Sequence, residues 1–158
     1  MKVISKERTH VEKYNVYVAN DGTEFMNEGE CRKYDESAEG VLNAMLRKIM
    51  VKETYEENLL DFGSSDNTME IYRPTCEEDK KNIMQMFLLI NPHLSKAEHQ
   101  HLVERAEKLI DRAIKEGDYL LVGRGYDYDC FWLYGTCHSM QERIENFCKQ
   151  AEKKDENA

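Results

Sequence analysis

The sequence has few of the features that restrict a chain to a special class of protein. It contains only two prolines among 158 residues, and no apolar run approaches the roughly 20 residues that a membrane-spanning helix needs. The polar start Met1–Arg8 lacks the apolar core of a signal peptide. With 41% hydrophobic and 34% charged residues, the composition is that of a globular protein. We expect a single cytoplasmic domain over residues 1–158, frayed at 1–10 and 153–158.

The cysteines lack the spacing of a disulfide framework or a zinc site. Their number is odd, their spacing is irregular and no Cys-x-x-Cys pair occurs. The five positions are Cys31, Cys76, Cys130, Cys137 and Cys148. Cys137 and His138 could gather Cys130 and Cys148 around a zinc ion, but paired ligands at short spacing are missing on each side. We therefore predict reduced, mostly buried thiols, no metal and no cofactor.

Recognisable catalytic motifs are also missing. The chain has no Walker loop, no Gly-x-Ser-x-Gly elbow and no His-Glu-x-x-His pair. His99 and His101 are two residues apart, so on a helix they point about 200° apart and cannot share one metal ion. The sequence favours a protein without enzymatic activity, and a catalytic site assembled from scattered residues remains the alternative.

What the chain does have is negative charge concentrated in one stretch. The formal net charge is -9, and residues 53–79 hold nine acidic side chains against one basic side chain, Arg73. This distribution disfavours binding to nucleic acid backbones and to anionic membranes, which need clusters of cations. We predict a protein partner with a basic surface. The candidate acidic surface consists of Glu53, Glu56, Glu57, Asp61 and Asp66.

The first third of the chain predicts a hairpin followed by helix. Residues 11–19 alternate like a half-buried strand, the turn Asn20–Gly22 tolerates positive φ, and residues 23–25 can return as a partner strand. Asn27 is a plausible N-cap. Apolar residues then recur at helical spacing as far as Ile49, and Gly40 inside this pattern leaves open whether there is one kinked helix or two.

The rest of the chain predicts a strand at 69–73, three helices and a second hairpin. Capping boxes that start at Thr75, Ser95 and Ser139 mark the three helices. The hairpin strands, 118–123 and 128–134, are expected at the sheet centre. This order predicts an α+β domain, in which about four helices pack on a mainly antiparallel sheet of about five strands.

The segment between the last two strands is the best candidate for a small-ligand site. Glycines allow a ligand close to the backbone, a guanidinium suits phosphate, and tyrosines can stack on a base. The candidate residues are Gly123, Arg124, Gly125, Tyr126 and Tyr128. A small nucleotide is the expected ligand. The alternative is a hairpin turn in which the glycines only satisfy backbone geometry.

The strand Cys130–Tyr134 is apolar on both of its faces. Such a strand belongs in a sheet interior or at an interface between copies of the chain, because an exposed apolar set must be covered. The sequence therefore also leaves open whether the chain forms a homo-oligomer.

The opening pattern Tyr17-x-Ala19-x-Asp21-Gly22-x-x-Phe25, followed by Cys31 and Tyr34, resembles the hairpin–helix start of many small bacteriophage and prophage accessory proteins. The resemblance implies a phage-encoded protein that acts by binding in a bacterial cytoplasm, including against host defence systems. Three hypotheses follow: a non-enzymatic binder that modulates a host protein through an acidic and aromatic surface, a binder that sequesters a nucleotide signal through Arg124, and an enzyme with an unrecognised site.

Overall fold

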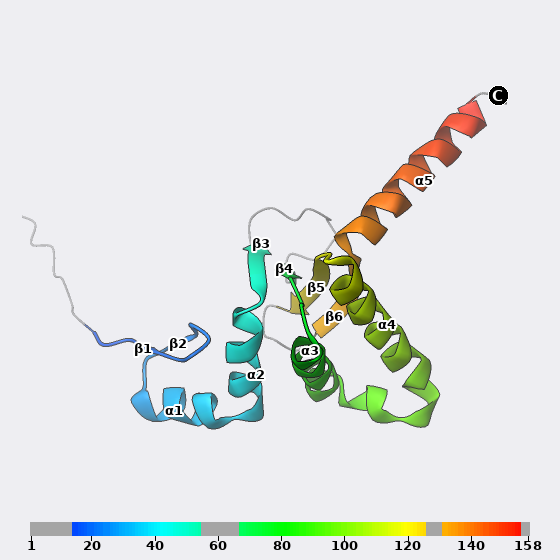
Figure 1. Cartoon of the computed structure of the whole chain (residues 1–158). Coiled ribbons are helices and arrows are strands. Elements are labelled where there is room, and N and C mark those ends of the chain that lie inside the picture. Colours follow the sequence, from blue (N-terminus) through cyan, green and yellow to red (C-terminus); the bar gives the residue numbers. More distant parts are fainter. Residues whose placement is uncertain (1–13, 55–66, 126–130, 156–158) are drawn as a thin grey trace, which may run out of the picture.

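The computed structural model describes residues 14–54, 67–125 and 131–155 (Figure 1). It confirms the predicted α+β class, with a separate hairpin and a larger antiparallel sheet. The strands are β1 (Tyr17–Val18), β2 (Glu24–Phe25), β3 (Met50–Thr54), β4 (Asn67–Tyr72), β5 (Leu120–Gly125) and β6 (Phe131–Thr136). The α-helices are α1 (Glu28–Glu36), α2 (Ala38–Arg47), α3 (Glu77–Ile90), α4 (Gln100–Glu116) and α5 (Cys137–Asp155).

The larger sheet has the strand order β3-β4-β5-β6, and every neighbouring pair is antiparallel. The predicted hairpin of β5 and β6 is confirmed. Its predicted place at the sheet centre is wrong for β6, which is an edge strand. The sequence also missed β3, which directly follows a helix and pairs with β4.

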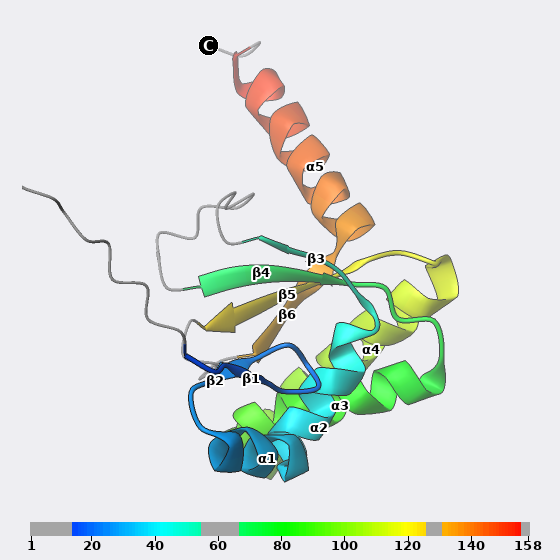
Figure 2. The ribbon, with the colours of Figure 1, turned by 90° about the vertical axis from the view of Figure 1, so that its left-hand side faces the viewer.

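Three helices cover one face of the sheet. In Figure 2, α2, α3 and α4 lie together on one side of the strands, while α5 extends to the other side. The core between these layers is apolar and almost fully inaccessible to solvent. It contains Leu46, Ile83, Phe87, Ile110, Val122 and Phe131. The predicted deep burial of the helix through Asn82–Ile90 is confirmed for 82–84, Met86 and Phe87, whereas Leu88 and Ile90 are half-buried and Gln85 and Leu89 are exposed.

The helix that starts at Asn27 is two helices. Asn27 caps α1 as predicted, because its Oδ1 accepts hydrogen bonds from the N–H groups of Gly29 and Glu30 at 2.8 and 3.2 Å. Ser37 then ends α1 and caps α2, accepting from the Gly40 N–H at 3.0 Å. Gly40 therefore lies in the first turn of the second helix rather than inside one long helix.

The three predicted capping boxes do not form as expected. Cys76 precedes α3 without capping it through its side chain, and Asp79 instead accepts hydrogen bonds from the N–H and hydroxyl of Thr75. After α3 the chain makes two 3-10 turns, Pro92–Ser95 and Ala97–His99, before α4 begins. Gly117 ends α4 in the left-handed conformation with φ 66°, as the sequence predicted.

The last helix starts earlier and packs less than expected. It begins at Cys137, two residues before the predicted Ser139. Figure 1 shows α5 extending away from the sheet and the other helices. Ile144, predicted on its apolar face, is 55% exposed. Within the described ranges, no helix is both long and apolar enough to cross a membrane.

Candidate functional site

The predicted ligand loop around Arg124 is partly a strand. Gly123, Arg124 and Gly125 lie in β5, between β4 and β6, so the prediction of a loop at these three positions is wrong. A Cβ on Gly123 would collide with the ring of Tyr134. The glycine is therefore explained by side-chain packing. Tyr126 and Tyr128 lie outside the described residues.

Arg124 points to the helix-covered face of the sheet and is buried, with 3% of its surface exposed. Its Nε lies 3.5 Å from Oε1 of Glu70, which is itself buried on the neighbouring strand β4. Its guanidinium also lies over the Phe131 ring, 5.3 Å from the ring centre. The Tyr72 hydroxyl donates a hydrogen bond to the other Glu70 oxygen. A buried charge needs such partners, because unpaired burial of a charge is strongly unfavourable.

A chain of hydrogen bonds continues from Arg124 to the N-terminal hairpin. Arg124 donates to Oδ1 of Asn43 on α2, and Asn43 Nδ2 donates to the Tyr34 hydroxyl at 2.7 Å. Tyr34 then donates to Oδ2 of Asp21, in the hairpin turn, also at 2.7 Å. We call this set of side chains the Arg124 network. Its members are Asp21, Tyr34, Asn43, Glu70, Tyr72 and Arg124.

The network depends on a protonated tyrosine. Burial, together with the hydrogen bond to Asp21, raises the pKa of Tyr34 to about 12. The phenol is therefore a donor at neutral pH, when a carboxylate can only accept. This arrangement connects β1, β2 and α1 to the sheet through α2.

A pocket of about 150 Å³ lies where the network crosses from the hairpin turn to the sheet. Its lining includes Asp21, Asn43, Glu70, Arg124 and Arg47. Pockets that hold drug-sized ligands usually measure about 300–1,000 Å³. The described pocket is therefore small for a nucleotide, and the polar atoms of the network already contact one another.

The predicted acidic surface is described at one position only. Glu53 lies in β3, where its backbone pairs with that of Glu70. The other four residues of that surface fall outside the described ranges. They are Glu56, Glu57, Asp61 and Asp66.

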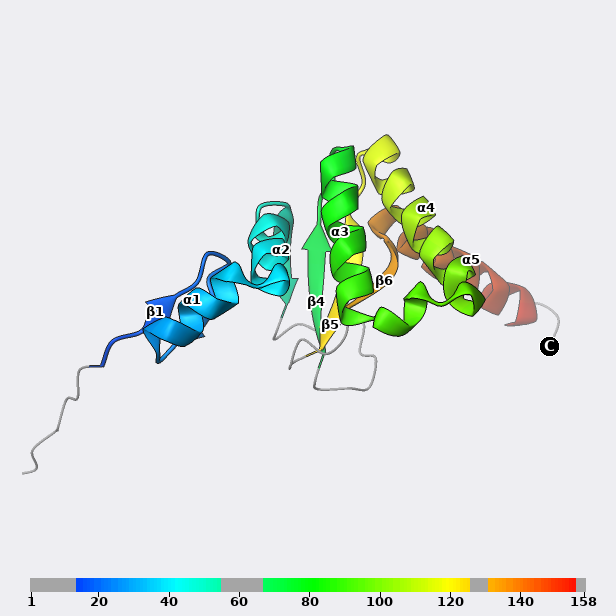
Figure 3. The same ribbon diagram turned by 90° about the horizontal axis from the view of Figure 1, so that it is seen from below.

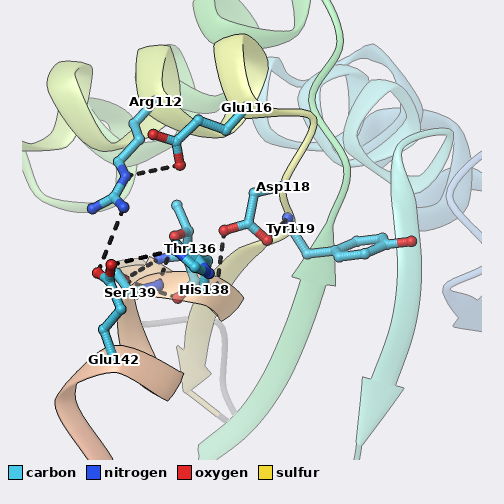
Figure 4. Close-up of polar contacts among 8 residues, drawn as sticks. All are labelled: Arg112, Glu116, Asp118, Tyr119, Thr136, His138, Ser139 and Glu142. Carbon is cyan, nitrogen blue, oxygen red and sulfur yellow. Dashed lines mark hydrogen bonds and ion pairs between the residues drawn. The ribbon is translucent and has the colours of Figure 1, made fainter. Parts of the chain in front are cut away.

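A second polar cluster joins α4 to the start of α5 (Figure 4). It brings Asp118, His138 and Ser139 together, which are residue types found in catalytic triads. However, Asp118 accepts from the backbone N–H of His138 at 3.0 Å and not from the imidazole. The Ser139 hydroxyl donates to the Thr136 carbonyl at 2.9 Å. These contacts cap the N-terminus of α5.

The surroundings of this cap also disfavour the reactive thiolate form of the neighbouring thiol. Burial, followed by the negative charge of Asp118, raises the pKa of Cys137, which disfavours the nucleophilic thiolate. Arg112 braces the junction, with Nε 2.9 Å from Glu116 and NH2 3.6 Å from Glu142. Among the described residues, no group of three or more His, Cys, Asp or Glu side chains could hold a metal ion.

The segment formed by β1, β2 and α1 has an exposed surface that the sequence did not predict. We call residues 14–36 the hairpin–helix unit, which lies at one side of the molecule and reaches the sheet through α2 (Figures 1 and 3). Apolar side chains on this unit are exposed by 38% at Val16, 60% at Val18 and 67% at Met26. The unit also carries six acidic against two basic residues. The alternation of residues 14–18 is visible in the sequence. The sequence does not show which of these side chains stay exposed to solvent.

Comparison with known proteins adds no functional information about either cluster or this surface. No protein-family model, no curated protein and no solved structure matches the chain.

Proposed function

We propose that this chain is a non-enzymatic binding protein that attaches to a host protein through the hairpin–helix unit and thereby modulates it. The observation that carries the proposal is the exposure of Val16, Val18 and Met26 on a unit with excess negative charge. Apolar side chains rimmed by polar ones are characteristic of protein interaction sites. The expected partner surface is basic and offers apolar contacts.

The buried side chains of the hairpin–helix unit hold its exposed surface in place. Cys31 is buried, and Phe25 packs against Tyr34 with ring centres 5.3 Å apart. The Arg124 network holds the same unit against α2 and the sheet. A surface held in this way binds with less loss of conformational freedom than a loose segment does.

The resemblance of Tyr17–Tyr34 to phage and prophage accessory proteins suggests the setting. We propose a phage-encoded protein whose partner is a bacterial host protein, with a defence protein as the target class. The acidic residues predicted at 53–66 would add to the same attraction for a basic partner.

No observation on the described residues supports the nucleotide-binding alternative. Arg124 is buried against Glu70, and the adjacent pocket of about 150 Å³ is too small for a nucleotide. It stays an untested prediction, since Tyr126 and Tyr128 lie outside the described residues.

The proposal can be tested by capture of bacterial proteins on the immobilised full chain. The test variant carries Glu24→Lys and Glu36→Lys, two exposed positions of the hairpin–helix unit. Glu36 ends α1, where a lysine suits the helix dipole. The control variant carries Glu104→Lys and Glu107→Lys, which make the same charge change on exposed positions of α4.

We expect the captured partner to bind the test variant roughly tenfold more weakly and the control variant with little change. Binding to the unmodified chain should also weaken as salt concentration rises. Equal binding by both variants, or salt-independent binding, would contradict the proposal. A second variant, Met26→Ser, separates the apolar contribution from the charge.

A further inference from the structure

The two edges of the larger sheet differ in their side chains. Both edge strands, β3 and β6, have one strand neighbour within the described residues, and both contain a register irregularity. The sequence of β3 contains Lys52 and Glu53, and charged residues are a type that disfavours pairing of an edge strand with another chain. β6, with the sequence Phe-Trp-Leu-Tyr-Gly-Thr, carries no charge and no proline. It therefore lacks the side chains that usually prevent strand addition.

A groove of about 320 Å³ runs along this uncharged edge. Three consecutive residues of β6 line it: Trp132, Leu133 and Tyr134. Consecutive residues of a strand point to opposite faces of the sheet. The register of β6 shifts between Leu133 and Gly135, and the groove lined by all three residues borders β6 next to the position that a further strand would occupy.

The helices beside β6 complete an apolar wall. Leu109 on α4 and Phe87 on α3 line the groove. The Trp132 ring contacts Phe87 edge-to-face, with ring centres 6.0 Å apart, and lies 6.5 Å from the His93 ring. Trp132 is nevertheless 36% exposed. It is a positioned aromatic side chain of the kind that supplies much of the binding energy at interfaces.

Two arginines add positive charge to the groove. Arg105 from α4 and Arg143 from α5 line it, and both helices lie toward the β6 edge of the sheet (Figure 3). Within the described residues neither arginine forms an ion pair, although the chain has 31 acidic and 22 basic residues. The groove is therefore complementary to an apolar ligand that carries negative charge.

We propose that β6 accepts an extended acidic segment of a partner protein as an additional strand, with its apolar side chains in the groove and its carboxylates at Arg105 and Arg143. At the ends of β6 the Phe131 carbonyl already accepts from the Asn91 amide, and the N–H and carbonyl of Thr136 bond to the Ser139 hydroxyl. The backbone hydrogen bonds to an added strand would therefore form between these ends, while the groove selects apolar side chains and the arginines select acidic neighbours. A second copy of β6 would bring no carboxylate to the arginines. This surface is opposite in charge to the hairpin–helix unit and independent of it.

The single tryptophan of the chain makes the groove directly observable. Short random peptides displayed as a library are first selected on the full chain, and the best binders are synthesised. Their binding is then followed through Trp132 emission, which no other tryptophan obscures. We expect the selected peptides to alternate apolar and polar residues with an excess of Asp and Glu.

Charge reversal in the groove and methylation of the peptide backbone separate the contributions of the arginines and of backbone hydrogen bonds. Arg105→Glu with Arg143→Glu should weaken the binding of acidic peptides by about tenfold or more and shift selection toward basic peptides. The control, Lys108→Glu with Lys149→Glu, reverses two exposed charges on the same helices outside the groove and should leave affinity nearly unchanged. N-methylation of alternate peptide amides should abolish binding in one register only, as strand addition requires.

Several results would overturn the proposal. They are a selection without acidic excess, equal loss of affinity in both double variants, full binding by peptides methylated in either register, and no change in Trp132 emission at saturating peptide. A dimer in light scattering that acidic peptides fail to dissociate would assign the edge to a second copy of the chain instead.

Discussion

At the scale of single residues, the buried pair of Arg124 and Glu70 is the connection on which the sheet and the hairpin–helix unit depend. Both residues are at most 3% exposed, so removal of either partner leaves the other charge buried without its ion pair. The pair also holds the Asn43 amide, which in turn holds Tyr34. A change at Arg124 should therefore affect folding stability before it affects any ligand.

Arg124→Met should lower the free energy of unfolding by about 3–5 kcal/mol, because it leaves the Glu70 charge buried without its partner. Urea denaturation measures this change. The double variant Glu70→Gln with Arg124→Met should lose clearly less than the sum of the two single losses. Strictly additive losses would show that the two side chains do not interact in the folded protein.

Asp118 gives the protein a dependence on pH. Burial alone would raise its pKa, but hydrogen bonds from the Thr136 side chain and from the N–H groups of Tyr119 and His138 lower the pKa overall. A lowered folded-state pKa means that the unfolded chain binds a proton more readily. The stabilisation is thus complete above the ordinary aspartate pKa and is lost as the pH falls through the folded-state value.

Asp118→Asn should therefore cost about 1 kcal/mol of unfolding free energy at neutral pH, because the two carboxylate oxygens accept from the N–H groups of Tyr119 and His138 and an amide keeps only one acceptor oxygen. The difference from the unmodified chain should shrink below about pH 4. Chemical denaturation at several pH values measures it, with Glu104→Gln as an exposed control on α4. A difference that does not change with pH would contradict the assignment of Asp118 as an ionised cap.

At the scale of elements, the junction between α1 and α2 decides the direction of the hairpin–helix unit. Ser37 donates to the Tyr34 carbonyl at 2.7 Å and accepts from the Gly40 N–H. A Cβ on Gly40 would collide with that same carbonyl. The glycine thus permits the close turn between two helices.

Gly40→Ala should lower the melting temperature, although alanine has the higher helix propensity by about 1 kcal/mol. The clash with backbone should cost roughly 1–3 kcal/mol, as overpacking usually does. Gly29→Ala in α1 is the comparison, because its nearest neighbour is a side-chain atom, Asn27 Oδ1, at 3.2 Å. A higher melting temperature for Gly40→Ala would indicate one continuous helix.

Local patterns predicted most elements but not where they begin or what they contact. Asn27 and Gly117 were correctly predicted as helix ends, since a cap depends on its immediate neighbours. β3 was missed because residues 50–54 become a strand only by pairing with β4, which follows more than ten residues later. Arg124 was assigned to a loop because the sequence does not reveal Glu70 or Asn43 as its partners.

At the scale of the whole molecule, stability should be unevenly distributed. β4 and β5 are each paired on both sides, and α3 contributes Ile83, Met86 and Phe87 to the core. β1 and β2 comprise two residues each and pair only with one another. The hairpin–helix unit is joined to the sheet mainly through α2 and the Arg124 network.

Hydrogen exchange measured by mass spectrometry should show this gradient. Peptides from β4, β5 and α3 should exchange at least roughly 100-fold more slowly than peptides from β1 and β2. Arg124→Met should further speed exchange in α1 while leaving the order of the segments unchanged. Equal protection of β1 and β5 would contradict the predicted gradient.

Asn43 has a consequence for how this chain can evolve. Its amide donates to Tyr34 with one end and accepts from Arg124 with the other. Aspartate lacks the donor, serine is too short to reach both neighbours, and glutamine is one methylene too long for the same space. Exposed residues of the hairpin–helix unit can therefore diversify as a partner changes, whereas position 43 tolerates almost no substitution. A mutational scan for folded protein would find an almost invariant residue that is buried behind the hairpin–helix unit and is not among the exposed side chains of either proposed binding surface.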